Sequence, residues 1–186
     1  AERVIIAMGS VTEAIRETID HLTAQGEKVG LVAVHLYRPF SAKHFLAAVP
    51  ATAKTIAVLD RTKEPGANGE PLYLDVKECF YGKENAPVIV GGRYGLGSND
   101  TTPAQILAVY ENLALPEPKN QFTLGIVDDV TFTSLPQKEE VAMGGEGMFE
   151  AKFYGLGADG TVGANKNSVK IIGDNTNKHC QAYFSY

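Results

Sequence analysis

The chain has 186 residues, of which 44% are hydrophobic and 21% charged, proportions typical of a globular protein with a well-buried core. Its 17 basic and 22 acidic residues give a net charge of −5, which does not favour nucleic acid or an anionic membrane surface as a partner. No apolar run approaches the roughly 20 residues needed to span a bilayer. We therefore expect neither nucleic-acid nor membrane binding.

The cysteines and the chain ends add two expectations. Cys79 and Cys180 lie far apart and form no Cys-x-x-Cys pair, which argues against an iron–sulfur or zinc site and fits a reducing cytoplasm. The chain starts at Ala1 without a signal-peptide pattern, and Tyr186 follows an apolar stretch with no closing helix. We expect a cytoplasmic location and a segment cut at both ends from a longer protein.

The first half of the chain alternates strand and helix patterns. An apolar strand over residues 3–8 precedes a helix in which Ser10 and Glu13 form a capping box. A second strand is predicted over residues 28–37, and His35, inside it, is expected to be a hydrogen-bonded core histidine. A short helix then starts at a Ser41 cap.

Two further strand–helix units follow. An apolar strand ends at Asp60, and Pro71 begins the next helix, because a proline in the first turn loses no needed hydrogen bond. Residues 87–91 predict a fourth strand, followed by a glycine-rich loop and a helix capped by Thr102. This alternation predicts an α/β fold: an open, mostly parallel, doubly wound sheet with helices on both faces.

The last third of the chain has a different character. Composition changes at residues 115–118, and residues 121–133 are expected to form a strand pair or an edge strand. Residues 136–147 are polar and rich in glycine, typical of an exposed linker. A strand at residues 152–154 and a following helix predict the first βα unit of a second α/β domain. The predicted domains are residues 1–118 and 151–186, joined by a connecting segment over 119–150.

The strongest motif for chemistry is GLGADGTVG, residues 155–163. Gly155, Gly157 and Gly160 match the three glycines of a dinucleotide fingerprint, and the helix that follows offers free amides to a phosphate. The chain ends before an acidic ribose-binding residue about 20 residues further on is reached. The alternative interpretation is a tight strand-to-helix turn that binds no ligand.

A second loop, residues 91–98, lies where the fourth strand ends. Arg93 is able to clamp a carboxylate or phosphate bidentately, but we favour a structural pair between Arg93 and Asp60. The sequence contains no nucleophile elbow, HExxH motif or paired-carboxylate arrangement. From the residues alone, the chain carries no catalytic set of its own.

Five runs of the sequence resemble one enzyme family. They are VHLYRPFSAKHFL, IAVLDRTKEPGANGEPLYLDV, VIVGGRYGLGS, FTLGIVDDVTFTSLP and FYGLGADGTVGANKNSVKIIGDN. In this order they look like the single-chain pyruvate:ferredoxin (flavodoxin) oxidoreductases, and the resemblance covers nearly the whole chain. It implies an enzyme that oxidises pyruvate with coenzyme A to acetyl-CoA and CO2 and passes electrons to ferredoxin or flavodoxin.

The resemblance also implies a role for each part of the chain. Residues 1–118 are similar to the second domain of these enzymes, a Rossmann-like domain resembling the C-terminal domain of transketolases. Residues 151–186 are similar to the start of the γ-like third domain, which is associated with coenzyme A. Coenzyme A contact is carried onto five residues near the glycine motif: Gly160, Thr161, Val162, Asn165 and Lys166.

What the chain lacks is equally informative. The resemblance implies thiamine diphosphate, Mg2+ and [4Fe-4S] clusters in a parent enzyme that forms a homodimer, but their binding motifs are not in these residues. We therefore expect an internal, inactive piece whose partners are the remaining domains of the parent. Two alternatives are a free-standing module that binds a nucleotide or coenzyme A, and a pure interaction domain.

Overall fold

The structure is a computed structural model that describes residues 1–128, 130–136, 138–141 and 147–184. Contacts divide the chain into two units, residues 1–143 and residues 144–186. Within the described residues, no helix is both long and apolar enough to cross a membrane.

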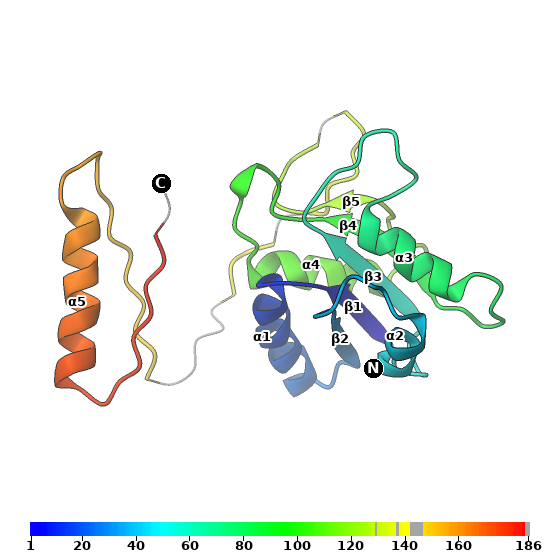
Figure 1. Cartoon of the computed structure of the whole chain (residues 1–186), viewed down its shortest axis with the longest axis horizontal. Coiled ribbons are helices and arrows are strands. Elements are labelled where there is room, and N and C mark those ends of the chain that lie inside the picture. The colour runs from blue at the N-terminus through cyan, green and yellow to red at the C-terminus, as the bar shows by residue number, and fades with distance from the viewer. Residues whose placement is uncertain (129, 137, 142–146, 185–186) are drawn as a thin grey trace. The chain divides into compact units, whose positions relative to one another are not determined.

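The first unit is built on a five-stranded sheet in the order β2-β1-β3-β4-β5. All of its strand pairs are parallel, which confirms the predicted open α/β fold (Figure 1). The strands are β1 (Arg3–Ala7), β2 (Val29–Ala33), β3 (Thr55–Asp60), β4 (Val88–Arg93) and β5 (Phe122–Thr123).

Strands β1 and β3 form the buried centre of the sheet. Residues 4–7 of β1 and 56–58 of β3 are fully buried, because both faces of the sheet are covered by helices. Such strands read as continuous apolar runs rather than alternating ones, which is why the sequence predicted them.

Helices cover the two faces of the sheet in pairs. They are α1 (Val11–Ala24), α2 (Ala42–Ala48), α3 (Pro71–Phe80) and α4 (Pro103–Ala114), with a short 3-10 turn, η1 (Leu96–Ser98). Helices α1 and α4 pack into one core cluster, and α2 and α3 pack into the other (Figure 1). The sheet is therefore doubly wound, as predicted.

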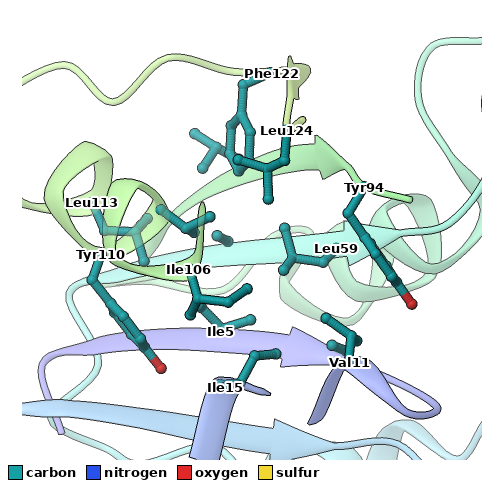
Figure 2. Close-up of a cluster of buried hydrophobic side chains, with 14 of the residues drawn as sticks. Ile5, Val11, Ile15, Leu59, Tyr94, Ile106, Tyr110, Leu113, Phe122 and Leu124 are labelled. Atoms are coloured by element: carbon teal, nitrogen blue, oxygen red, sulfur yellow. The ribbon is translucent and has the colours of Figure 1, made fainter. Parts of the chain in front are cut away.

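The segment after α4 closes the sheet at its β4 edge. Strand β5 pairs with β4, confirming the predicted edge strand, and Thr123 also forms a parallel bridge with Ser134. The side chains of Phe122 and Leu124 are buried in the same core as α1 and α4 (Figure 2). Residues 122–124 thus complete the core that α1 and α4 form on one face of the sheet. The domain limits at residues 118 and 151 stay a prediction.

Helix starts were predicted with mixed success. The Ser41 and Thr102 side chains accept hydrogen bonds from the His44 and Gln105 amides at 3.5 and 3.4 Å, confirming both caps. The predicted Ser10 cap is wrong: Ser10 already has helical dihedrals and its side chain makes no capping bond. Gly9 has a left-handed conformation, with φ of 81°, and the chain adopts helical dihedrals directly after it, at Ser10, one residue before α1 begins.

The second strand is shorter than predicted. Strand β2 pairs only with β1, and its ladder stops at Ala33 because Ala33 faces Ala7, the last residue of β1. The amide of Val34 still donates to Ala7, after which the chain leaves the sheet. His35 is therefore exposed, and its expected place as a core histidine is wrong.

Residues 147–184, the described part of the second unit, contain one helix, α5 (Thr161–Asn175), as predicted. The predicted strand at residues 152–154 is wrong, because these residues are exposed and have no strand assignment. A strand needs a partner to satisfy its backbone groups, and the described residues of this unit offer none. None of the residues 161–175 of α5 is buried.

Candidate functional site

The carboxyl edge of the sheet is the first place to look for a ligand site. Helices α1 and α3 follow β1 and β3 onto opposite faces, and ligands of open α/β sheets bind in the crevice at such a point. Here Tyr94 lies at that crevice, with 7% of its surface exposed and its hydroxyl 3.4 Å from the Met8 carbonyl oxygen. Figure 2 shows its ring beside Leu59 and Val11. Burial raises the pKa of Tyr94. The crevice is therefore lined by the domain's own aromatic side chain.

Asp60, at the end of β3, serves the fold. Its two carboxylate oxygens accept hydrogen bonds from the amides of Leu72 and Tyr73, at 3.0 and 3.1 Å, in the first turn of α3. Asp60 is 4% exposed, and this burial is the main reason that its pKa is raised. The amides at the start of α3 that would hold an anion are thus already taken.

Arg93 pairs with a different carboxylate from the one predicted. Asp60 and Arg93 are neighbours in the β3–β4 register, but Arg93 Nε lies 2.5 Å from Oε1 of Glu70. Arg93 Nη1 also donates to the Gln121 carbonyl at 3.1 Å. The predicted Arg93–Asp60 pair is therefore wrong, because both Asp60 oxygens accept amides of α3.

The Glu70–Arg93 pair lies deep in the domain. Glu70 is 1% exposed, and its second oxygen has no hydrogen-bond partner within the described residues. Because the guanidinium of Arg93 also binds the Gln121 carbonyl, the pair joins the start of α3 to β4 and to the residue that precedes β5. Its geometry is that of a buried structural ion pair.

Two further arginines at this edge contact other parts of the domain. Arg38 Nη1 lies 2.8 Å from a carboxylate oxygen of Asp75 on α3, and its guanidinium stacks 3.8 Å from the centre of the Tyr37 ring. Arg61 lies over Gly95, where a Cβ atom would come within 2.9 Å of Arg61 Nε. The first contact joins the loop after β2 to α3, and the second joins the loop after β3 to the loop after β4.

An open hollow of about 510 Å³ lies at the opposite, amino edge of the sheet. Among its lining residues, Glu2 lies 3.0 Å from Lys28 Nζ and 2.6 Å from Lys54 Nζ. These hydrogen bonds lower the pKa of Glu2 to about 2. The charges of the hollow therefore compensate one another.

In the second unit, the glycine motif forms a compact turn before α5. A Cβ atom at Gly155 would come within 2.5 Å of the Thr161 hydroxyl, so this position requires glycine. Gly160, the residue before α5, has φ of 89°, a conformation that favours glycine. The glycines thus let the backbone fold back onto the start of the helix.

The turn already contains an acceptor for its amides. The carboxylate of Asp159 accepts hydrogen bonds from the amides of Leu156 and Thr161, both at 2.9 Å. Hydrogen bonds from Thr161 are the main reason that the pKa of Asp159 is lowered. This role of Asp159 was not predicted from the sequence, although aspartate beside a helix start is a known capping signal.

All of the predicted coenzyme A residues lie at one end of α5. Gly160 precedes the helix, Thr161 and Val162 begin it, and Asn165 and Lys166 occupy its second turn. Lys166 is exposed, and its ammonium lies 5.5 Å from the centre of the Phe184 ring. The arrangement offers first-turn amides and one nearby cation beside an ionised carboxylate.

The described residues contain no group of three or more side chains suited to hold a metal ion. Cys79 is partly buried on α3, and Cys180 is exposed in the second unit.

Comparison with known proteins identifies relatives along the whole chain. The family model of the pyruvate:ferredoxin oxidoreductase core domain II matches residues 1–106. The chain is 61% identical over its full length to a pyruvate-flavodoxin oxidoreductase of Klebsiella pneumoniae and 58% identical to a pyruvate:ferredoxin oxidoreductase of Moorella thermoacetica. It is 52% identical to a probable pyruvate-flavodoxin oxidoreductase of Escherichia coli. In each case the chain spans only 16% of the relative's length.

Proposed function

Because the chain belongs to the pyruvate:ferredoxin oxidoreductase core domain II family, we propose that it is a scaffold segment of such an enzyme. The complete protein would oxidise pyruvate with coenzyme A to acetyl-CoA and CO2 and reduce ferredoxin or flavodoxin. The observation that carries this proposal is the 50–61% identity to these enzymes over the whole chain. The internally paired charges of Asp60, Glu70 and Arg93 support a structural role for the first unit.

The redox centres would lie in other parts of the protein. A [4Fe-4S] cluster takes four cysteine thiolates, whereas this chain has two cysteines in different units. Thiamine diphosphate and Mg2+ would likewise be held by the remaining domains, which are the partners of this segment. The complete enzyme would be a cytoplasmic homodimer.

The proposed scaffold role of the chain can be tested directly. Purified residues 1–186, supplied with thiamine diphosphate, Mg2+, pyruvate, coenzyme A and a viologen dye, should reduce no dye. The complete enzyme, assayed beside it, supplies the positive control. Pyruvate-dependent reduction by the segment alone would contradict the scaffold role.

For the second unit, the proposed ligand is coenzyme A at the start of α5. The Val162 and Gly163 amides lie in the first turn, where amides lack partners within the helix, and Lys166 offers a positive charge one turn on. Asp159 limits the fit, because its carboxylate holds the Thr161 amide and repels a phosphate. We therefore place the phosphate contact at Val162, Gly163 and Lys166 rather than at Thr161.

The test is a charge reversal in the complete enzyme. Lys166→Glu should raise the KM for coenzyme A about tenfold, the effect of losing roughly 1.4 kcal/mol of binding, with little change in the KM for pyruvate. Lys170→Glu, one turn further from the helix start and also exposed, is the matched control. An unchanged KM for coenzyme A in Lys166→Glu, or an equal rise in Lys170→Glu, would contradict the contact.

The alternative function is a free-standing module that binds coenzyme A or a nucleotide. The exposed glycine turn at residues 155–160 is the observation that favours it. Calorimetric titration of residues 1–186 with coenzyme A separates the two proposals. A module should bind with a defined stoichiometry, whereas a scaffold segment needs the rest of the enzyme to complete the site.

A further inference from the structure

The described residues of the loop after β5 combine internal hydrogen bonds with exposed apolar side chains. We define the Asp128 loop as the described residues 126–128 and 130–134. Val127, Val130 and Phe132 are 85%, 80% and 70% exposed. Single exposed apolar residues are ordinary on protein surfaces, but a group within one short loop is a recurrent sign of an interaction site.

The shape of the loop is fixed from within by Asp128. One carboxylate oxygen accepts the amides of Val130 and Thr131, at 3.0 and 2.9 Å, and the other accepts the hydroxyl groups of Thr131 and Thr133. These hydrogen bonds, those of Thr131 first, hold the pKa of Asp128 well below its usual value. The carboxylate therefore stays ionised at neutral pH and continues to accept hydrogen bonds from Val130, Thr131 and Thr133.

The base of the loop is tied to the sheet. The Thr123 amide donates to the Thr133 carbonyl at 3.3 Å, and the Leu135 amide donates to the Thr123 carbonyl at 3.1 Å. Lys119 Nζ donates to the carbonyls of Phe132 and Ser134, at 3.0 and 3.2 Å. The loop is thus an extension of the β5 edge, and its position is set by the domain.

This order matters for binding energy. Fixing a loop costs conformational entropy, and a loop already fixed before association does not incur that cost when it binds. Phe132 is held at φ of 55°, which is uncommon for an aromatic residue, while 70% of its surface faces solvent. The loop is therefore preorganised with its apolar side chains outward.

The chemistry of the loop defines what fits it. Several of its amides and hydroxyl groups bond within the loop, so the partner need supply chiefly an apolar depression for the three side chains.

We propose that the Asp128 loop docks into an apolar depression on another domain of the same polypeptide. The chain spans 16% of the length of its relatives, so most of the surface available to cover the loop belongs to the rest of such a protein. A domain of the same polypeptide is held at high effective concentration, so even a small apolar contact is occupied. This contact is independent of the proposed coenzyme A site.

Photocrosslinking in the complete enzyme tests the proposal. Phe132 is replaced by p-benzoylphenylalanine, and Tyr81, 85% exposed at the end of α3, receives the same replacement as a matched control. Val130 is the second test position, in case the change at Phe132 prevents folding. The enzyme is assembled from mixed light and 15N-labelled copies, so that mass spectrometry separates links within one copy from links between copies.

The expected result is a crosslink from position 132 or 130 to residues of the same copy outside residues 1–186, with at least a tenfold lower yield from position 81. Crosslinks only to another copy, only to a different protein, or only within residues 1–186 would overturn the proposal. So would crosslinking yields at positions 132 and 130 no higher than at position 81.

Discussion

Helices α4 and α5 are of similar length, but seven residues of α4 are buried against the sheet whereas none of the residues 161–175 of α5 is buried. The difference does not come from helix signals, because α4 starts at a threonine cap and α5 at a glycine turn closed by Asp159. It comes from what the two helices can pack against. The first unit contains a core on each face of its sheet, whereas the described residues 147–184 of the second unit form no sheet that its apolar side chains could cover.

The comparison predicts its largest effect at Phe122, which is fully buried where Gly92 leaves room for its ring. Phe122→Ala should lower the free energy of unfolding of residues 1–186 by about 3–5 kcal/mol, the usual cost of an aromatic cavity. Phe149→Ala, at an 86% exposed position, should change it by less than about 0.5 kcal/mol. Urea unfolding followed by circular dichroism measures both free energies. Equal losses in the two variants would show that burial of Phe122 does not stabilise the first unit.

The next effect concerns the buried ion pair. Arg93→Met leaves the Glu70 carboxylate, 1% exposed, without its cation and should destabilise the first unit by about 3 kcal/mol. The double variant Arg93→Met, Glu70→Met should recover most of that loss, because no charge remains buried. A double variant at least as unstable as Arg93→Met alone would mean that the cost arises from packing.

A smaller effect should depend on pH at Asp60. Its pKa is raised in the folded state, so the stabilisation linked to Asp60 is complete below the unfolded value near 4 and is lost as pH rises through the higher folded value. Asp60→Asn removes this dependence and replaces one of the two acceptor oxygens by an NH2 group, at a cost of about 1 kcal/mol near pH 4. The stability difference between wild type and variant, measured by urea unfolding, should shrink between pH 4 and pH 7. A difference that grows with pH would refute the raised pKa.

The smallest effect is expected at Tyr94. Tyr94→Phe keeps the ring in the crevice and removes only a hydroxyl 3.4 Å from the Met8 carbonyl, so the loss should be under about 1 kcal/mol. A loss of unfolding free energy above about 2 kcal/mol, in thermal or chemical unfolding, would show that the hydroxyl contributes more than one ordinary hydrogen bond.

Much of this fold was predictable from local signals. Continuous apolar runs identified β1, β3 and β4, and prolines at positions 71 and 103 marked two helix starts. Strand β2 was overextended, because its end is set by the last residue of its neighbour β1 and not by its own composition.

The site was less predictable. The glycine turn before α5 was predicted because positive φ angles favour glycine, and Gly157 and Gly160 both have such angles. The partners of Asp60 and Arg93 were not, because several charges meet at one edge and local sequence does not decide which two pair. Only the placement of Leu72 and Tyr73 in the first turn of α3 explains why Arg93 binds Glu70.

Amide hydrogen exchange of purified residues 1–186 tests the contrast between the two units most directly. We predict that amides of β1, β3 and α4 exchange only through global unfolding of the first unit, while amides of α5 exchange at least about 100-fold faster. Protection of α5 equal to that of α4 would contradict the account, because α5 would then share a cooperative core that residues 144–186 do not supply by themselves.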